Sequence, residues 1–508
     1  MSSQLFRTKN IDRLLADAEN PEKRLKKTLG WLSLTALGIG AIIGTGIFVL
    51  TGTAAAGEEV LYPSLLKAPL LDVLLHGTHA AGIAGRPGAG PAIALSFFLV
   101  ALVCGFAGLC YAELASMIPI AGSAYTYTYA TLGELVAWII GWDLILEYAV
   151  SNMAVAVGFS AYVKSLLATF GIHLPTVLSA PSYSPGGGWT LHFNVVGFII
   201  VMCLTILLVI GIRETAEANS IMVGIKLVAI FIFIVFASKY IQPANWRPFM
   251  PNGWQGVLTG GAIVFFSYIG FDSVSTAAEE CKNPRRDLPI GILLSLLVCA
   301  TLYVGVAVVL TGVQHYSMFR GDAAPVASAL HNLGLDRLQH WVTVGALMGM
   351  ISSLLVYQLG QARVWFAMSR DGLLPSAFSR VHRRFRTPHV ATWVAGLVVG
   401  IPAGIFDIGT LADLSNIGTL FAFVFVALAV LILRRTQPDR PRGFRVPLVP
   451  WLPMLSVLTC VILMASLTVE NWIRFFVWLA IGMVIYFSYS RKRSALAVEN
   501  ALAEGAKR

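Results

Sequence analysis

The sequence predicts an all-α integral membrane protein with about twelve transmembrane helices. Hydrophobic residues make up 57% of the 508 residues and charged residues only 12%, whereas a soluble domain carries about 25% charged residues. Apolar runs of the roughly 20 residues that a helix needs to cross a bilayer recur along nearly the whole chain. These observations argue against a series of soluble domains.

Twelve apolar runs define the predicted spans. The first half of the chain contains five of them: Trp31–Leu50, Ala92–Ala112, Val136–Phe159, Val195–Ile212 and Ala216–Phe236. The second half contains seven: Gly256–Ala278, Ile290–Gly312, Trp341–Gly360, Val390–Phe406, Leu411–Leu433, Leu452–Val469 and Ile473–Tyr489. Residues 1–30 and 491–508 are polar tails. Because no cleavable signal pattern precedes the first span, we expect that span to insert the chain itself.

The distribution of Lys and Arg predicts that both tails are cytoplasmic. With the N-terminus inside, 27 of the 36 Lys and Arg residues fall in cytoplasmic segments and 8 in outside loops, and the remaining one, Lys226, lies within a span. Cytoplasmic loops of membrane proteins carry such an excess. The bias favours an even number of spans, and it accounts for the net charge of +10 without a nucleic-acid partner.

Sequence motifs typical of other functions are absent. The chain has no P-loop for ATP, no HExxH or CxxC metal cluster, and no interpretable Ser, His and Asp set. Its six cysteines lie within apolar runs or at the end of one, without the spacing of a disulfide framework or a zinc site. We therefore expect no enzymatic activity, no cofactor and no bound metal.

Two spans have sequences that predict interrupted helices. The first reads GIGAIIGTGIFVLTG, and each glycine weakens a helix by up to about 1 kcal/mol relative to alanine; we expect its break at Gly44–Gly46. The sixth contains FFSYIGFDSV, with an expected break at Ser267–Gly270. Interruptions in corresponding spans of two halves indicate a transporter site. Close helix packing through small residues is the alternative.

A pair of interrupted helices suits a zwitterionic amino acid. The N-terminus of a half-helix holds a carboxylate through free N–H groups and the helix dipole, while carbonyl groups at a half-helix C-terminus hold an ammonium group. Phe266 stands next to the second expected break. It either covers the bound side chain or packs as an ordinary core residue.

Lys226 is an ionisable residue in the middle of the span Ala216–Phe236, about 15 Å from either end at 1.5 Å per residue. That distance is too long for its side chain to reach an interface. Asn219 shares its helical face, which suggests that this face points into the protein. An intramembrane ionisable group is a functional hypothesis by default. We interpret Lys226 as a proton-coupling group or as a fixed cation in place of sodium; a structural lysine bonded to helix-end carbonyls is the alternative.

The third span also carries acidic residues. Glu147 either contacts a cationic substrate or acts in a gate, or it pairs only with an internal Arg or Lys; Asp143 lies one turn away. Asp272 follows the second expected break and is a candidate cap for the helix that resumes there.

Four stretches together resemble the amino acid–polyamine–organocation superfamily, and within it bacterial homologues of the cationic amino acid transporters. They are GAIIGTGIF at Gly40–Phe48, IMVGIKLVAI at Ile221–Ile230, FFSYIGFDSVSTAAEE at Phe265–Glu280 with KNPRRDLP at Lys282–Pro289, and MSRDGLLP at Met368–Pro375. Their order and spacing cover most of the chain. The combination is specific, although GTG alone would be weak.

The resemblance implies an inverted repeat of five plus five helices, over residues 31–238 and 254–434, followed by two additional helices over residues 449–490. It implies that Lys226 occupies the place of a sodium ion in sodium-coupled relatives and supports proton coupling. It also implies a substrate site in which the backbone of Thr45 and Gly46 binds the carboxylate beside Ile42 and Ile43, and in which the amino group is bound around Phe266, Ser267 and Ile269.

The chain departs from this pattern in one outside loop. Gly57–Gly90 is longer than in such relatives, and its stretch LYPSLLKAPLLDVLLHG fits a short interfacial helix or, as we favour, a tolerated insertion. This surface is where an unidentified membrane partner would dock.

Together these observations predict a proton-coupled amino acid symporter of a bacterial cytoplasmic membrane, with the lipid bilayer and a small amino acid as its partners. Alternatives are an exchanger of amino acids or amines without net proton coupling and a receptor that binds amino acids without transport.

Overall fold

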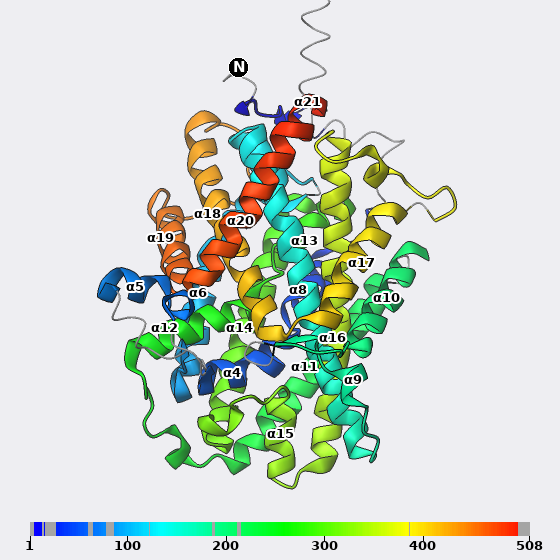
Figure 1. Cartoon of the computed structure of the whole chain (residues 1–508). Coiled ribbons are helices and arrows are strands. Elements are labelled where there is room, and N and C mark those ends of the chain that lie inside the picture. Colours follow the sequence, from blue (N-terminus) through cyan, green and yellow to red (C-terminus); the bar gives the residue numbers. More distant parts are fainter. Residues whose placement is uncertain are drawn as a thin grey trace, which may run out of the picture.

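The computed structural model consists almost entirely of helices (Figure 1). It describes residues 5–12, 15, 27–58, 64–77, 86–120, 122–184, 188–210, 215–385 and 387–495. Strands in these ranges form only two short antiparallel pairs: β1 (Gly57–Glu58) with β2 (Arg86–Pro87), and β3 (Tyr183–Ser184) with β4 (Gly188–Trp189). The predicted all-α class is confirmed.

Eight helical segments of the described residues are long and apolar enough to cross a membrane. They contain α6 (Ile93–Met117), α8 (Glu134–Thr169), α11 (Thr215–Ala237), α12 (Gly253–Val264) with α13 (Ser273–Thr276), α14 (Pro284–Val313), α16 (Asp336–Arg370), α18 (Ile408–Thr436) and α20 (Val469–Ile485). A bent pair adds another span, in which α3 (Trp31–Ile42) is followed by the π-helical η1 (Gly46–Leu50) and α4 (Thr51–Ala56). The remaining apolar helices are α10 (Val195–Ile210), α17 (His389–Ile405) and α19 (Trp451–Ala465). Each of the twelve predicted runs thus has its helix.

Shorter elements connect these helices. They are η2 (Leu65–Lys67), α5 (Leu70–His76), η4 (Gly90–Ala92), α7 (Ser123–Thr131), α9 (Thr176–Ser179), η5 (Ser238–Tyr240), η6 (Pro243–Trp246), η7 (Phe265–Tyr268), η8 (Ala278–Glu280), η9 (Tyr316–Phe319), α15 (Pro325–Asn332), η10 (Ser376–Ser379), η11 (Tyr486–Ser490) and α21 (Arg491–Arg493). Helix α7 was not predicted, because its Tyr- and Thr-rich stretch has no apolar periodicity.

The third span is longer than predicted. Helix α8 has 36 residues, from Glu134 to Thr169, where the sequence predicts Val136–Phe159. It packs against α16, α18 and α17 and therefore runs through the middle of the bundle. Most of α8 is buried by protein, including Glu134 before the apolar run and Ser160 after it, while its last turn, at Ala168 and Thr169, is exposed.

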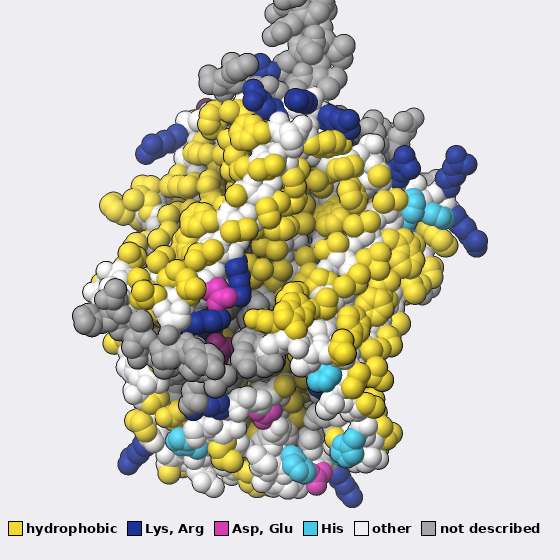
Figure 2. Space-filling view, in the orientation of Figure 1, with side chains coloured by type: hydrophobic (Ala, Val, Ile, Leu, Met, Phe, Trp, Pro, Cys, Tyr) yellow, Lys and Arg dark blue, Asp and Glu magenta, His cyan; other side chains and the backbone are white. Residues whose placement is uncertain are grey.

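The surface has the distribution of side chains expected in a bilayer. Hydrophobic side chains cover most of the middle of the visible face, and Lys and Arg gather mainly toward its ends (Figure 2). Helix α11 illustrates the two-sided pattern. Its exposed face carries Ile221, Ile225, Val228, Phe231 and Val235. The chain is a multi-pass membrane protein, and lipid rather than water is the solvent of this face.

The described N-terminal residues and α21 lie at the same end of the molecule (Figure 1). At this end, the residues before α3 pair with those after α13. The N–H of Leu29 donates to the Glu280 carbonyl at 3.0 Å, and the N–H of Lys282 donates to the Leu29 carbonyl at 2.9 Å. Leu29 and Cys281 thus form a parallel bridge. The starting point of the first span is attached to the end point of the sixth.

The long loop Gly57–Gly90 contains short helices. Residues 59–63 and 78–85 lie outside the described ranges, but η2 and α5 form between them, so the stretch expected as a short helix or a tolerated insertion is helical in part. The N–H of Leu70 donates to the Leu467 carbonyl at 2.9 Å, and Lys67 pairs with Glu470 at 2.5 Å. The turn between α19 and α20 therefore holds this segment in place.

Candidate functional site

The first predicted break is present in span one. Helix α3 ends at Ile42, and Ile43 is extended, with φ −81° and ψ 92°. The helix resumes at Gly46 with an axis bent by 41°. The break begins at Ile43, one residue before the predicted triplet, so Thr45 already belongs to the start of the second segment.

The second predicted break is present in span six. Helix α12 ends at Val264, a short 3₁₀ turn covers Phe265–Tyr268, and Ile269 is extended with ψ 140°. Gly270 follows with φ +113°. A side chain is strained there, and an added Cβ would also lie 2.8 Å from the Cβ of Ala41 on α3. Glycine is therefore required for this break beside the first broken helix.

The two breaks contact each other directly. A Cβ on Gly46 would lie 2.3 Å from Ser267 Oγ and 2.5 Å from Ser267 Cα, so only glycine allows this approach. The hydroxyl of Tyr303 on α14 lies 2.9 Å from the Ile42 carbonyl and 2.8 Å from the Ser267 carbonyl. One tyrosine thus joins the carbonyl ends of both interrupted helices.

A second tyrosine contacts the same region from α16. The hydroxyl of Tyr357 donates to the carbonyl of Ile269 at 2.8 Å. Each carbonyl oxygen has two lone pairs. The Ile42 carbonyl already accepts from the N–H of Gly44 at 3.1 Å as well as from Tyr303, whereas the carbonyls of Ser267 and Ile269 retain capacity for another donor. The predicted substrate residues around the breaks all lie together and are buried: Ile42, Ile43, Thr45, Gly46, Phe266, Ser267 and Ile269.

Two hydroxyl groups at the breaks have no partner in the protein. Thr45 Oγ1 and Ser267 Oγ are buried, and neither has a hydrogen-bond partner among the described residues. A buried hydroxyl without a partner costs roughly 1–3 kcal/mol. Both hydroxyls are therefore available to a polar ligand.

Lys226 points from α11 to the end of α3. Its Nζ donates to the carbonyl oxygens of Gly40 and Ile43, both at 2.9 Å, and its side chain is fully buried. The hydroxyl of Ser353 on α16 lies 2.8 Å and 3.0 Å from the same two oxygens. A cation therefore occupies the carbonyl end of the first half-helix. This geometry fits both the coupling hypothesis and its structural alternative.

Asn219 adds a second polar contact on the Lys226 face. Its Oδ1 accepts a hydrogen bond from Ser352 Oγ at 2.7 Å. An added Cβ on Gly40 would lie 3.0 Å from the Asn219 amide. The polar face of α11 therefore points toward α3 and α16, as the sequence suggested.

Glu147 lies deeper toward the end that carries both tails. Both of its carboxylate oxygens are buried and have no hydrogen-bond partner among the described residues, and the same holds for Asp143. No Arg or Lys of the described chain pairs with Glu147. The alternative of an internal ion pair therefore has no support among the described residues, and a contact with substrate or a gate role for Glu147 stays a prediction.

The predicted cap at Asp272 is wrong. Asp272 has helical dihedrals and makes no side-chain cap at α13. Its Oδ2 instead accepts from the hydroxyl of Tyr148 at 2.8 Å and from that of Ser123 at 3.4 Å. The carboxylate is drawn toward α7 and α8, because their hydroxyls are better placed than the first N–H groups of its own short helix.

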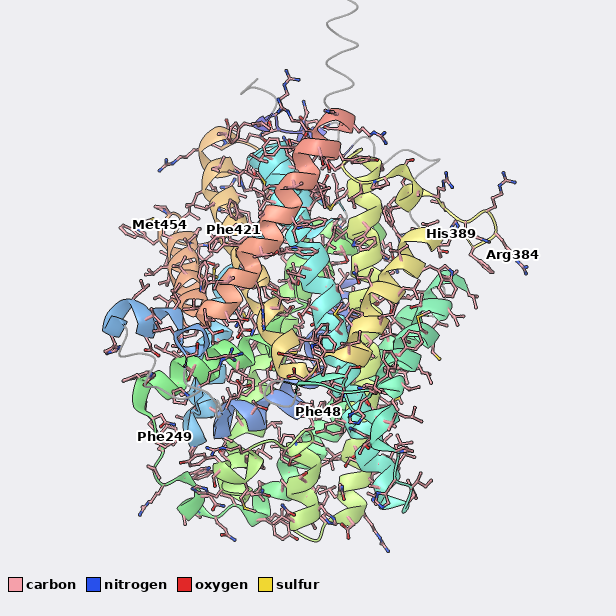
Figure 3. The ribbon with its side chains drawn as sticks, viewed as in Figure 1. Phe48, Phe249, Arg384, His389, Phe421 and Met454 are labelled. Atoms are coloured by element: carbon pink, nitrogen blue, oxygen red, sulfur yellow. The ribbon has the colours of Figure 1, made fainter. Side chains whose placement is uncertain are left out.

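The sequence interpretation missed the side chains that hold the breaks together. They are Tyr303, Ser353 and Tyr357, together with Tyr162, whose hydroxyl donates to the Phe48 carbonyl at 2.8 Å. Phe48 lies near the middle of the molecule, whereas Arg384 extends from a peripheral loop (Figure 3). The polar residue types of the three tyrosines and Ser353, inside apolar spans, could have pointed to them, because a polar group in a span must find a partner in the protein.

Comparison with known proteins relates the chain to membrane transporters. The profile of the family described as amino acid permease matches residues 29–488. The chain is 48% identical over 496 residues to the branched-chain amino acid permease BcaP of Bacillus subtilis (strain 168). The alignment covers 98% of this chain and 100% of that permease. The chain is 43% identical over 495 residues to the methylthioribose transporter of the same strain, covering 97% and 99%. Identity to the branched-chain amino acid permease BcaP of Lactococcus lactis subsp. cremoris (strain MG1363) is 34% over 482 residues, covering 93% and 96%.

Proposed function

Because the chain belongs to the amino acid permease family, we propose that it carries L-amino acids across a bacterial cytoplasmic membrane by proton-coupled symport. In this proposal both termini are cytoplasmic and the proton is the coupling ion. Substrate binds where the breaks in α3 and α12 meet, and tilting of the two broken spans alternates access between the two sides of the membrane.

The contact between the breaks supports recognition of a zwitterion. The hydroxyls of Thr45 and Ser267 have no hydrogen-bond partner among the described residues. Thr45 stands at the start of the resumed helix of span one, where N–H groups and the helix dipole favour a carboxylate, and Ser267 packs against the adjacent Gly46. The carbonyls of Ser267 and Ile269 each accept from one tyrosine and have capacity for an ammonium group. Phe266, buried beside them, is placed to cover the substrate side chain.

The observation that carries the coupling proposal is the position of Lys226. In its charged form the ammonium holds two carbonyls of α3, at Gly40 and Ile43. Loss of its proton weakens both bonds, because hydrogen bonds from a charged donor are roughly twice as strong as neutral ones. We propose that proton transfer at Lys226 thereby controls the tilt of the first span.

The relatives suggest which substrates to test first. Two of them are named branched-chain amino acid permeases, and Ile42, Ile43 and Phe266 supply an apolar surface at the breaks. We therefore propose leucine, isoleucine and valine as the leading substrates. The unpaired carboxylate of Glu147 leaves cationic amino acids as a second group to include.

The test is uptake of radiolabelled leucine into liposomes that contain the purified protein. An inward proton gradient alone should drive accumulation above the outside concentration, and collapse of the gradient should release it. An exchanger would instead require an amino acid inside the liposome and ignore the gradient. A receptor would bind leucine, with a raised melting temperature, but give no counterflow.

The relative of 43% identity supplies a second candidate, transport of methylthioribose. This molecule has neither an ammonium group nor a carboxylate, so it would leave the charge-binding features of the two breaks unused. Competition between methylthioribose and labelled leucine distinguishes the candidates: methylthioribose should not displace leucine if our proposal holds.

A further inference from the structure

The N-terminal segment before span one binds the end of the bundle. Lys9 Nζ pairs with Asp371 Oδ1 at 2.5 Å and lies 4.6 Å from the centre of the Tyr129 ring. The N–H of Lys9 also donates to the Tyr129 carbonyl at 3.2 Å. Two residues earlier, the carbonyl of Arg7 accepts from the N–H of Glu134 at 3.1 Å. The segment is thus held by both backbone and side chain.

The C-terminal segment binds the same two acidic residues. The N–H of Ala495 donates to the carbonyl of Asp371 at 3.0 Å, and the hydroxyl of Ser494 donates to Glu134 Oε2 at 2.5 Å. Gly372, next to Asp371, has φ +76°, and an added Cβ would lie 2.2 Å from the carbonyl oxygen of Arg493. The two ends of the chain therefore meet on one surface.

The helices that carry these acidic residues lead directly to the candidate substrate site. Asp371 follows the last residue of α16, and the same helix presents Ser353 to the break in α3. Glu134 is the first residue of α8, which carries Glu147 farther along. The hydroxyl of Tyr125 on α7 donates to Asp371 Oδ2 at 2.6 Å, and α7 packs on α8. An opening at this end that moves α16 away from α7 and α8 would have to break this hydrogen bond.

We propose that residues 6–9 and 493–495 form a terminal latch that keeps this end of the transport pathway closed, and that the latch opens once in each transport cycle. The inference depends on the proposed function only in naming transport as the process that the latch controls. Lys9 is its central residue, because it crosses between the N-terminal segment, α7 and Asp371.

The environment of Lys9 makes its contact stronger than an ordinary surface ion pair. The side chains of Lys9 and Asp371 are only 16% and 11% exposed, and the Tyr129 ring faces the ammonium group. Beneath them lies a small cavity lined by Lys9, Ile120, Tyr125, Thr126, Tyr129, Ala367, Arg370 and Asp371. The latch therefore covers space inside the protein, and its release would admit water there.

A buried reporter in this cavity tests the latch. Ile120 is 2% exposed, so a cysteine introduced there, Ile120→Cys, should react slowly with a water-soluble maleimide. The exposed native thiol is removed by Cys203→Ser and the nearest one at this end by Cys281→Ser; burial raises the pKa of the Cys281 thiol to about 11, which already makes it unreactive. Labelling is measured as the mass shift of purified protein with time.

In this background, Lys9→Ala should raise the labelling rate by roughly tenfold, from the combined loss of a cation–π contact and a partly buried ion pair. Lys9→Arg keeps both interactions and should label as slowly as the unmodified lysine. The matched control is Lys492→Ala, which removes an exposed lysine at the same end of the molecule, in α21.

The outcomes separate the latch from the proposed function. Equal labelling of the Lys9→Ala variant and its parent, with unchanged melting temperatures, would overturn the latch even if leucine uptake is proton-driven. Faster labelling in Lys9→Ala and in Lys492→Ala alike would also overturn it, because the effect would be one of charge alone. Faster labelling confined to Lys9→Ala, with no leucine uptake by any variant, would support the latch and reject the proposed function.

Discussion

Lys226 Nζ and the carbonyl oxygen of Ile43 are hydrogen-bonded at 2.9 Å, at the residue where the first span stops being helical. The partner of this lysine is therefore the backbone of the interrupted helix, and no carboxylate is needed to hold it. This hydrogen bond connects Lys226, the only lysine in the middle of a described span, to the break in the first span.

Replacement of the lysine tests its role in coupling. Lys226→Ala should abolish leucine accumulation driven by a proton gradient, because no amino group then contacts the carbonyls at the end of α3. The fold should persist with a loss of about 1 kcal/mol, since Ser353 still donates to Gly40 and Ile43. Lys164→Ala is the matched control, because Lys164 also donates to a backbone carbonyl, that of Ser179 at 2.8 Å, but far along α8. Normal gradient-driven accumulation by Lys226→Ala would remove the coupling hypothesis.

The unpartnered hydroxyl of Thr45 allows affinity to be separated from stability. Thr45→Val removes no hydrogen bond of the protein, so the free energy of unfolding should stay within about 0.5 kcal/mol or rise. Leucine affinity should fall about tenfold, because a hydrogen bond to a charged group contributes about 1.5 kcal/mol or more. The control is Thr51→Val, whose hydroxyl binds only its own helix at Ile47. Both quantities come from thermal unfolding at increasing leucine concentration, and equal affinity in the two variants would contradict the assignment.

The shared hydroxyl of Tyr303 should matter for both stability and binding. Tyr303→Phe leaves the carbonyls of Ile42 and Ser267 with one donor fewer, and we expect a loss of about 1–3 kcal/mol in unfolding free energy. Leucine binding should weaken as well, because the two breaks are no longer held at a fixed separation. Tyr240→Phe, at an exposed position, should change neither. A variant as stable and as tight-binding as the parent would show that Tyr303 does not position the site.

Close approach at Gly46 predicts a steric effect. In Gly46→Ala the new Cβ meets Ser267 Cα, a backbone atom that cannot rotate away. We expect a cost of about 1–3 kcal/mol, as in other overpacked cores, together with loss of leucine counterflow. Gly224→Ala on α11 meets no atom within 4 Å and should be neutral or stabilising by up to about 1 kcal/mol. Counterflow at the parent rate in Gly46→Ala would move the substrate site away from the breaks.

The features that could be predicted from the sequence are those set by composition and by single residues. Apolar runs of bilayer length predicted all twelve helices, and glycines placed both breaks within about one residue of their observed positions. Lys226 could be predicted to point inward, because a lysine at mid-span is too costly in lipid.

Other features depend on contacts that a single sequence does not reveal. The first turn of α8 precedes its apolar run, and Glu134 there is buried by neighbouring segments of the protein. Helix α5 forms where Leu70 and Lys67 bond to Leu467 and Glu470. The cap predicted at Asp272 was wrong for the same reason: hydroxyls from α7 and α8, distant in sequence, compete for its carboxylate. The five-plus-five repeat and the roles of the site residues stay predictions.

The parallel bridge between Leu29 and Cys281 restricts how this transporter moves. Since the backbone before α3 is paired with the backbone after α13, we expect α3 and α13 to move together. Their hinges are then the two breaks themselves. A rearrangement at either hinge is passed to the other through three hydrogen bonds of main chain, so side-chain substitutions at positions 28–30 and 280–282 should leave this mechanical connection intact.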